Sequence, residues 1–133
     1  MLPRVASSRF LPADVRGRTE VAQWVFWQMA GVGPMTGQAY HFKNAAPEQI
    51  PYAIDRYLAE VRRLWGVLDR RLADRDFIAG EYSIADMACF PWMRTPDRFG
   101  LDPAEFTHVN RWRETMAARP AVQRGLAVTG KPA

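Results

Sequence analysis

Residues 77–86 read FIAGEYSIAD, and this short stretch decides the fold. Its last four residues place a hydroxyl at Ser83 and a carboxylate three positions later at Asp86. This spacing predicts a capping box, in which each side chain bonds to the other residue's backbone amide, with Asp in place of the commoner Glu or Gln. The apolar residues that follow predict a core helix that begins at Ser83 and is perturbed by Pro91. The role predicted for Ser83 and Asp86 is therefore structural.

Upstream of this stretch, two segments show helical periodicity. A helix is predicted over residues 14–30, because Asp14 can cap it and one face repeats Val21, Trp24, Val25, Gln28 and Met29. The sequence GVGP at residues 31–34 predicts a kink, after which residues 35–42 resume as helix. The strongest periodicity covers residues 54–72, where apolar residues step by threes and fours for about five turns.

Downstream, Val109, Trp112 and Met116 mark a further helix that ends before Pro120, and residues 122–128 can form a short closing helix. The sequence has no period-two strand pattern and no internal repeat. The predicted fold class is therefore all-α, a bundle of four to five helices with short connections. We expect residues 1–10 to be an irregular N-terminal segment and residues 11–133 to form one helical domain.

The composition limits the function classes. A length of 133 residues with 48% hydrophobic residues suits a single globular domain. The one cysteine, Cys89, excludes an intrachain disulfide and favours a reducing compartment, so we expect a cytoplasmic protein. No apolar run approaches the ~20 residues that span a bilayer, and the net charge of +4 comes from scattered arginines, so neither a membrane nor a nucleic-acid partner is predicted. His41, His108 and Cys89 lie too far apart for a metal-ligand spacing, so no metal is expected.

Three motifs together resemble one protein family. The stretch at residues 77–86 resembles the capping-box signature in the helical C-terminal domain of glutathione transferases. The sequences QWVFWQMAGVGPMTGQAYHF (23–42) and IPYAIDRYLAEVRRLWGVLDRRL (50–72) resemble the bacterial nu-class branch, whose members include glutathione-dependent disulfide-bond reductases. The similarity covers about residues 11–128 and implies a glutathione-transferase C-terminal-like bundle.

The resemblance also implies contacts to glutathione. Arg56 matches a family arginine that contacts the carboxylate end of glutathione or its disulfide, and a guanidinium binds such a planar anion through two hydrogen bonds. Gln38, His41 and Phe42 fall where the first helical hairpin of the family approaches the ligand. Two alternatives stay open: Arg56 is a solvated helix arginine, and the other three side chains serve packing.

The function implied by the resemblance depends on a second domain. In the family a thioredoxin-like domain precedes the helices and activates the sulfur of glutathione, but no strand pattern precedes residue 11, so we expect that domain to be absent or supplied elsewhere. We therefore expect the substrate-side helical domain of a glutathione-dependent transferase or disulfide-bond reductase, forming a homodimer, with no catalytic residue of its own and incomplete as an isolated chain. Whether the chain is an enzyme stays open. The alternative is a noncatalytic interaction or dimerisation module derived from that domain.

Overall fold

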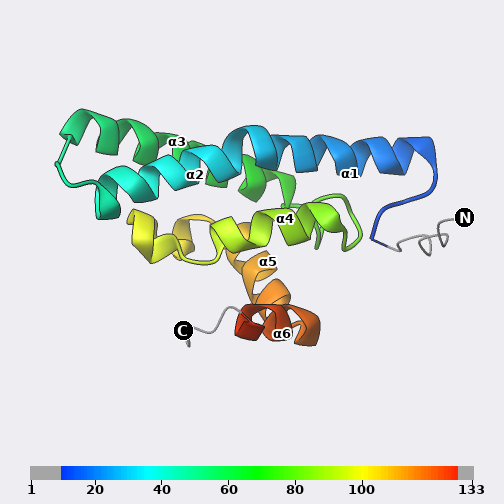
Figure 1. Ribbon diagram of the computed structural model, residues 1–133. Coiled ribbons are helices and arrows are strands. Elements are labelled where there is room, and N and C mark those ends of the chain that lie inside the picture. Colours follow the sequence, from blue (N-terminus) through cyan, green and yellow to red (C-terminus); the bar gives the residue numbers. More distant parts are fainter. Residues whose placement is uncertain (1–9, 129–133) are drawn as a thin grey trace, which may run out of the picture.

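The computed structural model describes residues 10–128, so the predicted N-terminal segment apart from Phe10, and the last five residues of the predicted domain, lie outside the described residues. Within residues 10–128 the chain is an all-α bundle with no strand (Figure 1). The predicted fold class is confirmed. The α-helices are α1 Val15–Trp27, α2 Gly33–Tyr40, α3 Pro51–Arg71, α4 Ile84–Met93, α5 Thr107–Ala117 and α6 Pro120–Val128, joined by π-helical turns η1 Gln28–Val32 and η2 His41–Ala45 and 3-10 turns η3 Pro96–Phe99 and η4 Pro103–Glu105.

The first two helices form one long rod, and α3 returns antiparallel beside it (Figure 1). In place of the predicted interruption at GVGP, the helical conformation continues through the π-helical turn η1, which takes up an extra residue. Pro34 is the second residue of α2, directly after this turn, and has no N–H to donate to the helical turn before it. The rod therefore passes Gly31 and Pro34 without leaving the helical state.

The long helix α3 contributes four side chains to the buried core. It begins at Pro51, ahead of the predicted residue 54, because proline is tolerated in a first helical turn. Its inner face buries Val61, Leu64, Trp65 and Leu68. It packs against both α2 and α5.

The carboxylate of Asp86, which is completely buried, links the start of α4 to the turn before it and to α5. One oxygen, Oδ2, accepts from the Ser83 backbone amide at 3.0 Å, as a capping box requires, and the Ser83 hydroxyl accepts from Ala85 N at 3.3 Å. The other oxygen, Oδ1, accepts from Ile78 N at 3.0 Å and from Trp112 Nε1 at 2.9 Å. Burial raises the pKa of Asp86, although these hydrogen bonds oppose the shift. A single side chain thus ties the turn before α4 and the helix α5 to the start of α4.

The turn that leads into α4 is compact. Gly80 has φ of +93°, a left-handed conformation that favours glycine, and it allows Phe77 and Gly80 to pair as an isolated bridge. The ring of Tyr82 contacts the rings of Phe10 and Phe77, each at 5.5 Å between centroids. Phe10 O also accepts from Ile84 N at 3.1 Å, so the chain that enters from the N-terminal side is held against the start of α4.

We predict that Asp86→Ala strongly destabilises the fold. The substitution removes the acceptor of four buried donors, which are Ile78 N, Ser83 N, the Ser83 hydroxyl and Trp112 Nε1. A buried donor left without an acceptor costs about 1–3 kcal/mol, so the free energy of unfolding should fall by about 3 kcal/mol or more. Chemical denaturation measures this value. The matched control is Asp14→Ala, because Asp14 caps α1 at an exposed site through Gly17 N and should cost only about 1 kcal/mol. Equal losses in the two variants would contradict the central role of Asp86.

Candidate functional site

The aromatic side chains at the end of the rod connect α2 to α3. Phe42 stacks on Tyr57, with ring centroids 5.5 Å apart and planes 6° apart, and His41 meets the edge of Phe42 at 5.0 Å. Phe42 is half-buried, whereas Gln38 and His41 are exposed at the same end of α2. Phe42 therefore serves packing at this point, and Gln38 and His41 present polar atoms to solvent.

Arg56 lies on the neighbouring part of α3, in a shallow groove of about 560 Å³. The groove is lined by Met35, Arg56, Tyr57, Ala59, Glu60 and Arg63. Gln38, His41 and Phe42 do not line it, so the four side chains predicted from the resemblance are divided between the groove and the end of the rod.

The charges in this groove leave the Arg56 guanidinium available. Arg63 forms two hydrogen bonds of 2.8 Å to Glu60, one from Nε and one from Nη2. These bonds, with a smaller effect of the Arg56 charge, hold the pKa of Glu60 below its usual range. Within residues 10–128, the Arg56 side chain makes no hydrogen bond or ion pair of its own. A planar anion could therefore bind it without displacing a partner.

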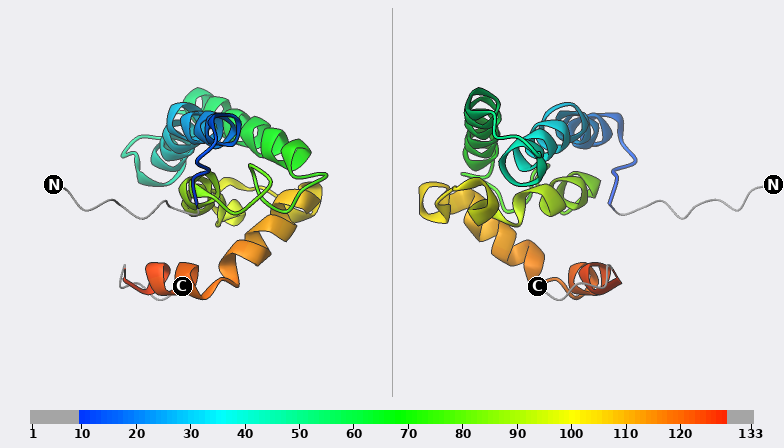
Figure 2. Two further views of the ribbon diagram at one scale, coloured as in Figure 1. Left: turned by 90° about the vertical axis from the view of Figure 1, so that its right-hand side faces the viewer. Right: turned by 60° about the vertical axis from the view of Figure 1, so that its left-hand side comes forward.

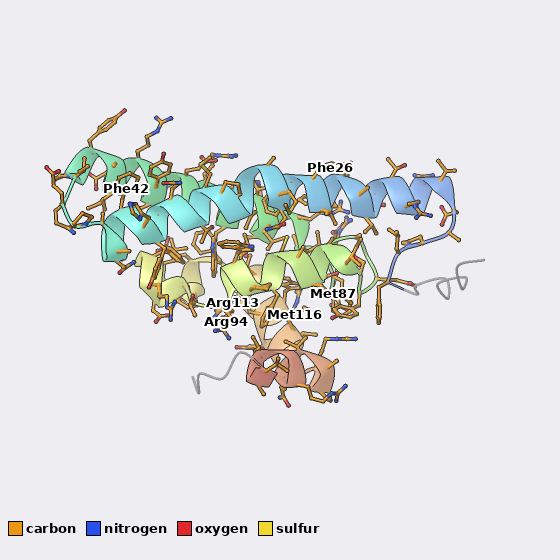
Figure 3. All side chains as sticks on the ribbon, in the orientation of Figure 1. Phe26, Phe42, Met87, Arg94, Arg113 and Met116 are labelled. Carbon is orange, nitrogen blue, oxygen red and sulfur yellow. The ribbon has the colours of Figure 1, made fainter. Side chains whose placement is uncertain are left out.

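A second groove, which sequence reasoning missed, lies between the rod and α4. It has a volume of about 500 Å³ and is lined by Gln28, Met29, Gly33, Pro34, Met87, Ala88, Pro91 and Trp92. Met29 is 64% exposed and Trp92 is 38% exposed, so the two side chains offer apolar surface to a ligand. The sequence signals for an irregularity here were GVGP at residues 31–34 and Pro91 inside α4, but no local pattern predicted that Pro34 and Pro91 line one groove. In Figure 3, Met87 on α4 and Phe42 at the end of the rod are well separated.

A third hollow, of about 530 Å³, lies where α4, α5 and α6 meet, beside Arg94 and Arg113 (Figure 3). Arg113 Nη2 donates to Arg94 O at 2.8 Å, and its Nη1 donates to Asn110 at 3.0 Å. Burial lowers the pKa of Arg113, and the acidic neighbours Asp97 and Glu114 oppose this shift. The hollow is lined by three arginines, Arg94, Arg98 and Arg113, and by two acidic residues, Asp97 and Glu114, and Arg113 closes the end of α4.

The remaining candidate chemistry is limited. Across residues 10–128, no group of three His, Cys, Asp or Glu residues could hold a metal ion. No helix in the same range is long and apolar enough to cross a membrane. Cys89 is fully buried in α4, and both burial and the charge of Asp86 raise the pKa of its thiol far above the usual range. The one thiol of the chain is therefore unsuited to act as a nucleophile.

A bundle built on a capped central helix, with grooves on two sides of the first helical hairpin, defines an all-α protein of the glutathione-transferase C-terminal type. The family model for the glutathione S-transferase C-terminal domain matches residues 34–120. The chain belongs to this family, as the motifs predicted.

Individual relatives agree with this assignment. The chain is 47% identical over 118 residues to the disulfide-bond oxidoreductase YfcG of Escherichia coli, covering 88% of the chain and 55% of the relative. It is 44% identical over 128 residues to the disulfide-bond oxidoreductase YghU of the same organism, covering 90% of the chain and 44% of the relative. The chain thus spans about half the length of the curated relatives it matches.

Solved structures give the same picture. A glutathione transferase from Burkholderia graminis, with two glutathione molecules bound per subunit, matches with a TM-score of 0.85 and 40% identity, over 93% of this chain and 55% of that one. A glutathione transferase from Pseudomonas putida, with one glutathione disulfide bound per subunit, also matches with a TM-score of 0.85 and 40% identity, over 93% of this chain and 57% of that one.

We predict that Cys89 is inert in the folded protein. At mildly alkaline pH, a thiol reagent such as dithiobis-nitrobenzoate should react completely with the chain unfolded in denaturant. Over the same time it should leave Cys89 of the native protein unmodified, because the thiol is buried and stays protonated. Absorbance of the released thiolate measures both reactions. Fast, stoichiometric labelling of the native protein would show that Cys89 is accessible and would contradict this account.

Proposed function

We propose that this chain is the substrate-side helical domain of a glutathione-dependent transferase or disulfide-bond reductase. The observation that carries the proposal is its membership of the transferase family, together with the glutathione or glutathione disulfide bound in structures 40% identical to it. Two curated relatives bear the name disulfide-bond oxidoreductase, which favours a disulfide as the second substrate.

In this proposal Arg56 binds a carboxylate of glutathione. Its side chain is exposed and is not held by Glu60, which Arg63 already engages. A guanidinium and a carboxylate form two parallel charge-assisted hydrogen bonds, which fix orientation as well as adding affinity. Gln38 and His41 would contact the ligand from the end of the rod, beyond the Phe42–Tyr57 stack.

The apolar groove between the rod and α4 would then hold the organic part of the second substrate. Its lining of methionine, proline and tryptophan suits an apolar group, and methionine side chains adapt to different shapes. A groove of this kind would bind electrophiles or mixed disulfides of varied structure.

The sulfur chemistry itself would take place on a thioredoxin-like domain supplied outside these helices. Disulfide exchange needs a thiolate that attacks a disulfide sulfur, and Cys89 cannot provide it. The chain corresponds to about half of its relatives, which leaves room for such a domain. We propose that these helices alone form the wall of the pocket and do not turn over substrate.

We also propose that the protein is a homodimer in a reducing compartment such as the cytoplasm. Several large apolar side chains are exposed, among them Phe26 at 73% on α1 and Tyr52 at 75% on α3. Exposed apolar surface of this kind favours association. The same side chains favour the second candidate function, a noncatalytic interaction or dimerisation module, which would use these surfaces without binding glutathione.

We predict that the chain binds glutathione through Arg56. Calorimetry with millimolar glutathione should give a measurable heat, and Arg56→Met should weaken the affinity about tenfold, because it removes a charge-assisted bond. The control Arg16→Met removes an exposed arginine from α1 and should leave the affinity unchanged. A wild-type titration without heat would leave only the interaction module, and equal affinity of the two variants would exclude Arg56 as the contact.

We predict that the purified chain is a dimer with twice the 15.2 kDa mass of one copy. Phe26→Glu should shift it to monomer, since a charge replaces a large apolar side chain that is 73% exposed. Gln23→Glu adds a charge at a nearby exposed site of α1 without removing apolar area, and should stay dimeric. Light scattering after size exclusion measures the mass. A strict monomer at high concentration would contradict the proposed homodimer.

A further inference from the structure

A small hollow adjoins the apolar groove between the rod and α4 and has no role in the proposed function. It has a volume of about 200 Å³ and is lined by Thr36, Gly37, Tyr40, Pro91, Trp92, Thr95, Arg98 and Phe99; we call it the Arg98 hollow. Pro91 and Trp92 also line the apolar groove, so the two spaces adjoin between the same helices. Figure 2 shows the rod and α4 side by side in both views, and η3, which carries Arg98, contacts α2.

The indole of Trp92 separates the Arg98 hollow from the apolar groove. A Cβ on Gly33 would lie 3.4 Å from Trp92 Cε2, and a Cβ on Gly37 would lie 3.9 Å from Trp92 Cζ3, so the ring lies close to the bare backbone of α2 at both positions. The two glycines are one helical turn apart, about 6 Å along the axis. Trp92 is 38% exposed, so the separation is a single side chain at the surface. A short aliphatic chain that lies along it joins the two spaces.

The lining of the Arg98 hollow is positive. Arg98 is exposed, and its guanidinium carbon lies 5.7 Å from the ring centroid of Tyr40. Within residues 10–128 the Arg98 side chain makes no hydrogen bond or ion pair. Arg98 also borders the hollow between α4, α5 and α6, but Asp97 lines only that other hollow. The other described residues that line the Arg98 hollow are uncharged, and Thr36 and Thr95 bring hydroxyl groups to it.

The size of the Arg98 hollow suits one end of a molecule. Sites that enclose a whole drug-sized ligand measure about 300–1,000 Å³, whereas this hollow has about 200 Å³. The adjoining apolar groove, of about 500 Å³, can hold the larger part of the same molecule. A guanidinium binds a carboxylate through two charge-assisted hydrogen bonds, so a carboxylate is the end group that Arg98 fits best.

We propose that the Arg98 hollow binds a carboxylate at the far end of the second substrate. This role rests on the proposed function, in which the apolar groove holds the organic part of that substrate. A short aliphatic chain would pass Trp92 and carry the carboxylate from the side of Gly33 to the side of Gly37. The substrate class selected in this way is an apolar disulfide or electrophile that ends in an acidic group.

The test uses two fluorescent probes that contain no glutathione. Dansyl-ε-aminocaproate has an aromatic body, an aliphatic chain and a carboxylate, and its methyl ester lacks the charge. Titration of the full chain, followed by dansyl emission, should show the acid binding about tenfold more tightly than the ester, with a smaller difference at high salt. Arg98→Met should weaken the acid about tenfold and leave the ester unchanged. The control Arg16→Met removes an exposed arginine from α1 and should change neither affinity.

A second pair of variants tests the space without changing charge. Gly37→Leu adds side-chain atoms at a residue that lines the Arg98 hollow, and it should weaken binding of the acid about fivefold. The control Gly125→Leu lies on α6, where an added Cβ would meet nothing within 4 Å, and it should leave binding unchanged. Thermal unfolding should show that both variants keep an intact fold.

Three results would overturn this role of the Arg98 hollow. Equal affinity of the wild-type chain for acid and ester, or no binding of either, would mean that the hollow does not select an anion. Equal weakening of acid and ester by Arg98→Met would mean that Arg98 acts through its packing on Tyr40. Unchanged binding of the acid to a folded Gly37→Leu protein would place the probe elsewhere. Failure of the proposed function is distinguishable from these results, because it appears as a loss of glutathione binding, which the two probes do not require.

Discussion

The structure depends on one buried carboxylate. Asp86 has no exposed surface, and removing a charged group from water is costly unless hydrogen bonds replace the lost hydration. Here the donors come from the turn before α4, from the start of α4 and from Trp112 on α5. These bonds fix where α4 begins and which way it points. Because α4 forms one wall of the apolar groove and one wall of the hollow beside Arg113, the shape of both follows from this link.

The long helix α3 separates two kinds of surface. Its inner face is part of the core, and its outer face carries arginines next to small residues. On the side facing α2, Arg56 and Tyr57 line the groove that we propose contacts glutathione. On the side facing η4, Arg62 and Arg70 line a groove together with Glu105, which pairs with Arg62.

Much of the fold follows from local signals. The capping box at Ser83 and Asp86 and the apolar repeat of α3 are set by neighbouring residues, so the sequence predicts them. The π-helical turn was not predicted, because the extra residue that it holds has no local signature. At its start Gln28 is buried, whereas Met29, expected on the same apolar face, is 64% exposed.

The sequence by itself determined the all-α class, the capped helix and the family, because each rests on short-range spacing. Only the tertiary structure decided the sites. It brought Met29 and Met87, distant in the chain, to one groove. It also placed Arg56 in a groove that neither His41 nor Phe42 lines, although the resemblance grouped them. The physical reason is that a groove forms where two helices cross, and the crossing is set by packing among many side chains rather than by any one segment.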